Sequence, residues 1–401
     1  MTQDVILSML FYLLIAVTTI YMAYKVQCSR RLGNVILTKT YYWGIFMILF
    51  LCSAFRFNVG NDYSQYTQTA HEASVGGYVV TEPGFNWLVR LVYGVCGGEY
   101  YEVVFALFAL FTLVLFLKVM YEQSEDFAFA FFLFMTLGLY FQTYNTVRYY
   151  LVLAMALYSI RFCLQRDWIK FICWILLASF FHKSVLIVIP IYWIATFIWK
   201  RWFIITCVIV STICFVAKKY VLKLALILYP SYENTVFLEG GTSVVTILRC
   251  LLVLGLYLWY IRYNKKNDIH NEKEHEIRMY AQLNFLALIC CVFFSFLPVV
   301  TRIVYYFSVN QILMLPMVTA GIADETARKK VKYLIIAFCV LYFLVFLMMA
   351  GQPGVNLPAV FCIRMSHRGT VQAFSLSRAC FMSVQSLLNL QTPYSQLESR
   401  R

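Results

Sequence analysis

The feature of this sequence that most limits its fold is a series of apolar segments that continues to residue 350. We distinguish twelve, at residues 5–24, 41–55, 101–117, 127–144, 149–165, 168–181, 184–199, 202–217, 243–261, 279–297, 303–321 and 333–350. A helix needs ~20 apolar residues to cross a bilayer, and backbone groups in lipid must be hydrogen-bonded within their own segment. The sequence therefore predicts an all-α polytopic membrane protein with about twelve transmembrane helices.

The composition excludes the soluble classes of protein. The chain is 62% hydrophobic and 13% charged, whereas soluble domains carry roughly a quarter charged residues. The net charge of +14 would suit nucleic acid, but the lysines and arginines lie mostly in short loops between apolar segments, as in membrane proteins. We therefore expect no nucleic-acid partner. Most of the thirteen cysteines lie inside apolar segments and none forms Cys-x-x-Cys, which indicates packing residues rather than disulfides or metal ligands.

The loop charges predict the orientation. The first segment has neither a basic region before it nor a small-residue cleavage site, so we expect a retained helix and not a signal peptide. Alternate loops hold 19 lysines and arginines on one side and 9 on the other, with five more in the C-terminal tail. Because positive loops stay in the cytoplasm, the N-terminus is predicted to lie outside. We divide the chain into a polytopic domain, residues 1–358, and a tail, residues 359–401, to which we assign no function.

Polar residues gather at the predicted outer ends of the segments, where a charge needs a reason because it costs ~2.5–3.5 kcal/mol at a helix centre. They are Arg56, Asp62, Tyr63, Tyr66, Glu82, Asn145, Arg148, His182, Lys183, Arg302 and Tyr305. Structural interpretations stay open for several of them. Arg56 would be an interfacial anchor, Asp62 a helix cap, Glu82 a partner of the dipole of a helix that starts at Pro83, and His182 a structural residue.

The same residue types suit an anionic, sugar-bearing substrate. Arginine forks bind phosphate oxygens bidentately. An acid can deprotonate a hydroxyl, and a diphosphate leaving group needs cationic stabilisation more than a metal. His182 has no second histidine or cysteine at ligand spacing, so we predict no metal and no cofactor.

In these residues the chain resembles the EpsG family of Wzy-like polysaccharide polymerases. The shared marks are Arg56…Gly60-x-Asp62-Tyr63-x-x-Tyr66, Glu82-Pro83-Gly84-Phe85, Asn145-x-x-Arg148, Phe181-His182-Lys183-Ser184 with Pro190, and Arg302-x-x-Tyr305, spread over residues 1–358. The resemblance implies a metal-independent glycosyltransferase of GT-C-like architecture. It would join undecaprenyl-diphosphate-linked oligosaccharide repeat units on the outer face of a bacterial inner membrane, in capsule, exopolysaccharide or O-antigen synthesis. Membrane lipid and a chain-length regulator are the further partners it suggests.

The resemblance also implies roles for the residues. Arg56, Arg148 and Arg302 would hold the diphosphate with help from His182. Asp62 or Glu82 would be the general base or position the acceptor, and Tyr63 and Tyr66 would contact sugars. Asn145, Lys183 and Tyr305 are further candidates for substrate binding. The chain departs from the family pattern at Tyr149, because the family often has glutamine after the arginine of Asn-x-x-Arg.

Other functions stay open. A lipid-linked oligosaccharide flippase, or another transporter, would place charges at mid-membrane along a path open to both sides, whereas these residues lie at span ends on one side. An O-antigen ligase shares the lipid-diphosphate donor, and an outer site alone does not exclude it. A membrane acyltransferase would need an intramembrane histidine paired with an acid, but His270 and His275 lie in a charged loop. A purely structural scaffold is the remaining alternative.

Overall fold

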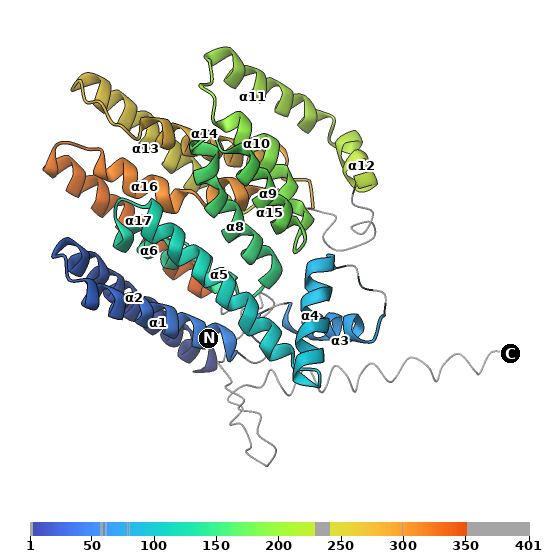
Figure 1. Ribbon diagram of the computed structural model, residues 1–401. Coiled ribbons are helices and arrows are strands. Elements are labelled where there is room, and N and C mark those ends of the chain that lie inside the picture. The colour runs from blue at the N-terminus through green and yellow to red at the C-terminus, as the bar shows by residue number, and fades with distance from the viewer. Residues whose placement is uncertain are drawn as a thin grey trace.

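The computed structural model describes residues 3–56, 59–60, 62–77, 79, 81–228, 241–298 and 300–350 (Figure 1). Within these ranges all regular structure is helical, so the prediction of an all-α protein is confirmed. The predicted tail, residues 359–401, lies outside the described residues.

The helices follow in chain order. They are α1 (Gln3–Arg31), α2 (Val35–Ala54), α3 (Tyr63–Ser74), α4 (Pro83–Cys96), α5 (Tyr101–Gln123), α6 (Phe127–Thr136), α7 (Leu139–Gln142), α8 (Val147–Leu164), α9 (Trp168–Ser179), the 3₁₀ helix η1 (Lys183–Ile187), α10 (Val188–Ala195), α11 (Arg201–Val216), α12 (Lys218–Leu228), α13 (Val244–Lys266), α14 (Glu274–Phe293), α15 (Val300–Ser308), α16 (Gln311–Ala320) and α17 (Glu325–Ala350).

In the described ranges eight helices are long and apolar enough to cross a membrane, or nine if α11 and α12, bent by 87°, count as one span. The eight are α1, α2, α5, α8, α13, α14, the consecutive pair α15–α16 and α17. The chain is therefore a multi-pass membrane protein, but neither the expected count of about twelve nor the GT-C-like architecture is confirmed. The predicted segments 127–144, 168–181, 184–199 and 202–217 form helices that are too short or too bent to be counted.

Two of the apolar segments are broken part-way. Gly138 adopts a φ of 73° and separates α6 from α7, while Val309 and Asn310 separate α15 from α16. At the second break a side chain bonds to a backbone carbonyl of the preceding helix: Asn310 Nδ2 donates to Phe307 O (2.7 Å). α6 and α16 pack on each other, so the two breaks lie in the same part of the bundle. In lipid, such breaks are tolerated where they are buried in protein or line a polar cavity.

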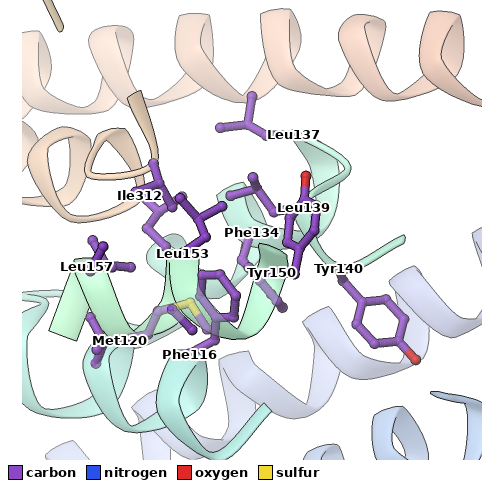
Figure 2. Packing of buried hydrophobic residues seen from close by; sticks show 14 of the residues in the cluster. Phe116, Met120, Phe134, Leu137, Leu139, Tyr140, Tyr150, Leu153, Leu157 and Ile312 are labelled. Carbon is purple, nitrogen blue, oxygen red and sulfur yellow. The ribbon is translucent and has the colours of Figure 1, made fainter. Parts of the chain in front are cut away.

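The core of the bundle surrounds α8. Of the span formed by α8, 78% is buried, and of the α15–α16 span 83%, against 28% for α1 and 17% for α17, which therefore lie at the periphery. Figure 2 shows this core from close by: Phe116 of α5, Phe134 of α6, Leu153 and Leu157 of α8 and Ile312 of α16 fill the space between their helices. Residues at the end of α8 are consequently held by a packed scaffold.

The short helices α3 and α4 do not span; they lie together at one end of the bundle, beside the start of α5 (Figure 1). We call this end of the bundle the α3–α4 end. Pro83 is the first residue of α4, as predicted. The backbone N–H of Gly84 donates to Phe180 O (2.9 Å), just beyond α9. This bond fixes the start of α4 against the turn that contains His182.

Candidate functional site

An ion pair between Glu82 and Arg148 forms the centre of the site. Glu82 precedes α4 and Arg148 lies in the first turn of α8, 66 residues later. The two side chains are 12% and 16% exposed. The other carboxylate oxygen of Glu82 accepts a hydrogen bond from the backbone N–H of Lys183 (3.2 Å). Glu82 forms no side-chain capping bond to α4, so its main contacts are across the site.

A close backbone approach holds Glu82 in place. A Cβ atom added to Gly84 would lie 2.6 Å from the carbonyl oxygen of Phe180, a separation at which one of the two backbones must move. Only glycine therefore allows α4 to start this close to the His182 turn. The sequence mark Glu82-Pro83-Gly84 thus has a local physical cause: proline starts the helix and glycine permits its approach.

His182 links this ion pair to α15. Its Nδ1 atom lies 3.8 Å from Glu82 Oε1 and 2.9 Å from Ser184 Oγ, which in turn contacts the hydroxyl of Tyr306 (3.0 Å). Its Nε2 atom lies 3.4 Å from Nη1 of Arg302. The predicted residues Glu82, Arg148, His182 and Arg302 are therefore brought together from four separate segments.

The environment keeps the imidazole neutral. Burial, and then the positive charges of Arg302, Arg148 and Lys183, lower the pKa of His182 to about 3. The backbone N–H of Ser184 points at Nδ1 (3.4 Å) and can only donate. Nη1 of Arg302, 3.4 Å from Nε2, can also only donate, so the two contacts require opposite tautomers of the neutral ring.

Asp62 occupies the N-cap position of α3, as the interpretation as a helix cap expects, but its side chain forms no capping bond. Burial raises the pKa of the Asp62 carboxyl above its ordinary value, and the positive charges of Arg302 and Arg148 act in the opposite direction. Asp62 is therefore within electrostatic reach of the arginines, and its carboxylate is more basic than one exposed to water.

Tyr63 and Tyr66 are buried, 6% and 8% exposed. The guanidinium carbon of Arg148 lies 5.5 Å from the ring centre of Tyr66 and 5.4 Å from that of Phe85, a cation–π arrangement. Tyr63 packs on the ring of Phe105 (5.2 Å). Both tyrosines pack within the protein beside the site, and their contact with sugars stays a prediction.

The rings of Tyr66 and Phe105 lie between Arg56 and Arg148. It is 3% exposed, donates to Ser53 O (3.2 Å), and its guanidinium carbon lies 5.1 Å from the ring centre of Phe105 and 5.4 Å from that of Tyr144. Its Nε atom has no partner, and it forms no ion pair with a described carboxylate. An exposed interfacial anchor would not be buried in this way, so that interpretation is wrong.

The remaining predicted residues border this cluster. Asn145 lies in the turn between α7 and α8, and Tyr305 is half-buried on α15. Lys183 has an exposed side chain and bonds to Glu82 through its backbone. No group of three or more histidines, cysteines, aspartates and glutamates suited to a metal ion occurs among the described residues.

A family model described as "EpsG family" matches residues 39–357. That match covers most of the chain. The chain belongs to the EpsG family. No curated protein and no solved structure matches it significantly. The family suggests a Wzy-like polysaccharide polymerase acting on a lipid-linked oligosaccharide, and every predicted site residue lies within the matched range.

Two tyrosines of this EpsG family member contact the cluster but were not predicted as site residues. Tyr149, where the family often has glutamine, donates from its hydroxyl to the backbone oxygen of Arg302 (2.7 Å), and its ring lies 5.8 Å from that of His182. Tyr306, one helical turn after Arg302, contacts Ser184 and was not among the candidates. Arg249 lies apart from this cluster; it was counted only as a loop charge, although its position inside an apolar segment was a signal.

A separate cavity of about 680 Å³ lies at the opposite end of the bundle, where the ends of α1, α5 and α8 meet the start of α14. Charged side chains of both signs line it, and some pair with each other: Arg161 lies 3.0 Å from Glu122. Because these charges are partly neutralised by one another, we assign it no substrate.

Proposed function

We propose that this EpsG family member is a metal-independent polysaccharide polymerase that joins oligosaccharide repeat units carried on undecaprenyl diphosphate. The observation that carries the proposal is the meeting of Glu82, Arg148, His182 and Arg302 at one end of a membrane bundle. Two guanidinium groups and an imidazole N–H would surround the diphosphate of the donor. The lipid chain would extend between the helices into the membrane.

In the proposed reaction a hydroxyl oxygen of the acceptor sugar attacks the anomeric carbon of the donor chain. A new C–O bond forms, and the bond between that carbon and the diphosphate oxygen breaks. The electrons of the broken bond leave with the lipid diphosphate, and the hydroxyl proton passes to a carboxylate. Arg148 and Arg302 stabilise the negative charge that develops on the leaving group, and His182, in the tautomer that carries its proton on Nε2, donates to one of its oxygens.

Asp62 is the proposed general base. Both oxygens of Glu82 are already engaged, by Arg148 and by the backbone N–H of Lys183, so neither points freely towards an acceptor hydroxyl. The half-buried Asp62 has a raised pKa and forms no side-chain capping bond, which favours proton transfer at neutral pH. Glu82 is then a positioning residue that holds Arg148 before substrate arrives.

The loop charges support a site on the outer face of the bacterial inner membrane, with the N-terminus outside. Capsule, exopolysaccharide and O-antigen are the products such a polymerase would serve, and a chain-length regulator is a candidate partner. A flippase is less well supported, because the residues of the cluster gather at the α3–α4 end. An O-antigen ligase would use the same donor and differs in its acceptor.

The test is glycan synthesis by the purified full-length protein in lipid nanodiscs supplied with lipid-linked repeat units. We expect long glycans, with one undecaprenyl diphosphate released for each new linkage. Arg302→Gln should abolish both products. Arg90→Gln, which changes an exposed arginine on α4 outside the cluster, should leave both unchanged. A wild-type protein that forms no linkage under these conditions would show that the proposal is wrong.

A gene deletion separates the alternatives in cells. Loss of long chains, with single repeat units still displayed outside, is the result expected for a polymerase. Loss of all surface repeats with accumulation in the cytoplasm would indicate a flippase. Polymer that is made but stays on its lipid carrier would indicate a ligase. A gel of lipid-linked and surface glycans distinguishes these three outcomes.

A further inference from the structure

Arg249 is a buried cation that the site described so far does not use. It lies in the second turn of α13 and is 4% exposed. Its guanidinium lies 3.5 Å from Ser308 Oγ, and its carbon is 5.7 Å from the ring centre of Tyr342. Its Nε atom has no hydrogen-bond partner, and it forms no ion pair with any carboxylate of the described residues. A buried guanidinium with no anion beside it is the unusual feature.

Polar side chains of α8 and α15 lie near Arg249, because its charge acts on the hydroxyl groups of Tyr150 and Tyr305. Tyr150 of α8 donates from its hydroxyl to Gln142 Oε1 of α7 (2.6 Å), and its ring lies 6.5 Å from that of Tyr305. Ser308 ends α15 at the second break. Broken helices in membrane proteins commonly line the sites of polar ligands. The half-buried Tyr305 lies on α15 between Ser308 and Arg302, one turn after Arg302.

A purely structural role does not account for Arg249. The neighbouring buried amides bond to each other and to the backbone: Gln311 Nε2 donates to Asn284 Oδ1 (2.6 Å), and Asn284 Nδ2 donates to Cys250 O (2.9 Å). These bonds do not involve the guanidinium. A charge in the membrane that neither pairs with an acid nor completes a network is typical of a ligand or ion site.

We propose that Arg249, with Ser308 and Tyr305, binds the diphosphate of a second polyprenyl carrier. The inference rests on the proposed polymerase function, because that reaction brings two lipid diphosphates, donor and acceptor, to one enzyme. Arg148, His182 and Arg302 bind one of them. Arg249 binds the other one to two turns deeper along α15, since Arg302 and Ser308 are separated by six residues, or about 9 Å of helix rise.

The experiment measures binding of undecaprenyl diphosphate, without sugars, to the full-length protein in nanodiscs. We expect two molecules per wild-type chain and one per Arg249→Gln chain. Arg249→Lys should retain two sites with the second weakened about ten- to hundredfold, because lysine keeps the charge but loses the fork. The exposed Arg90→Gln is the matched control and should bind two. If Arg249→Gln binds as many molecules as the wild type, with equal affinity, the inference is wrong.

A second measurement separates ligand binding from a structural role. Without lipid diphosphate, Arg249→Gln should unfold at the wild-type temperature or above it, because an unpaired buried charge has been removed. Added undecaprenyl diphosphate should then raise the unfolding temperature less than in the wild type. An unliganded variant that unfolds at a clearly lower temperature would show that Arg249 stabilises the fold, and would overturn the inference.

Glycan synthesis distinguishes the inference from the proposed function. If the wild type forms polymer and Arg249→Gln does so with the same kcat and the same KM for the lipid-linked unit, the second site is refuted while the polymerase stands. If the wild type binds two lipid diphosphates but forms no linkage, the polymerase is refuted while the second site stands. If the wild type binds none, both are refuted.

Discussion

Arg148→Gln should damage the protein in two separable ways, through the fold and through the chemistry. In the fold, it leaves Glu82 charged, 12% exposed and without its cation. Removing one member of a buried ion pair costs about 3–5 kcal/mol. The converse variant, Glu82→Gln, leaves the Arg148 guanidinium without its anion and should cost a similar amount. Lost glycan synthesis in either single variant could therefore result from unfolding alone.

The double variant Glu82→Gln/Arg148→Gln resolves this ambiguity. Two neutral amides replace the pair, so neither partner is left as an isolated charge. We expect it to be more stable than the sum of the single variants predicts, with a coupling free energy of about 1–3 kcal/mol. It should nevertheless form no glycan, because the Arg148 charge that would hold the diphosphate is absent.

The measurements are the free energy of unfolding of all four proteins in mixed detergent micelles and their glycan synthesis in nanodiscs. Arg90→Gln serves again as the control; it removes the hydrogen bond from Arg90 Nε to Ala73 O (2.9 Å), so a loss of about 0.5–1.5 kcal/mol is expected. Additive single effects would show that Glu82 and Arg148 do not form the buried pair. A folded double variant that still makes polymer would remove Arg148 from the site.

The other predictions concern separate parts of the site. Gly84→Ala should push α4 away from Phe180, cost about 1–3 kcal/mol and reduce synthesis, as thermal unfolding and the glycan assay would show together. His182 has a pKa near 3 against 6.5 in its unfolded state, so the unfolded chain binds more protons between these values and wild-type stability should fall as the pH drops below 6.5. His182→Gln should lose this contribution, and identical stability curves for the two proteins would contradict the pKa. Asp62→Asn should abolish linkage formation without loss of stability, and wild-type synthesis should decline on acidification as Asp62 takes up a proton. Cys96 is exposed at the end of α4, so a membrane-impermeant maleimide should label it in cells with a permeable outer envelope, and labelling only after lysis would reverse the proposed orientation.

The sequence predicted the helices and the grouping of the site better than the number of spans. Apolar periodicity and loop charge are local signals, and each of the twelve predicted segments does form helix. Whether a segment crosses the membrane in one piece depends on tertiary contacts that no local pattern records. Gly138 breaks the segment after α6, and a Cβ atom added to Gly138 would lie 3.0 Å from the ring of Phe346 on α17. Phe346 is about two hundred residues away in the chain.

The pairings inside the site were equally inaccessible from sequence. Glu82 and Arg148 were both named as candidates, but an ion pair across 66 residues follows only from the packing of α4 against α8 and the His182 turn. The burial of Arg56 and Tyr66 between aromatic rings has the same cause. Tyr149 shows the reverse case, because its position was noted as a departure from the family pattern and its hydroxyl proves to hold the backbone of Arg302.

The engagement of Glu82 before any substrate is present has a consequence for how the site would work. Its carboxylate neutralises Arg148 and lies 3.8 Å from Nδ1 of His182. It therefore acts as an internal anion at the position proposed for the substrate diphosphate. An incoming diphosphate must compete with it for Arg148, and the leaving diphosphate is displaced by it after the linkage forms. A cation cluster with no such competitor would bind the released diphosphate tightly and retain it. Binding the product as tightly as the transition state gives no gain in turnover. Arg249, which has no carboxylate beside it, would lack this release device. The two proposed diphosphate sites are therefore unequal: the Glu82 site favours exchange, as the departing carrier requires, whereas the Arg249 site holds the carrier that receives the growing chain until that carrier moves to the Glu82 site for the next linkage.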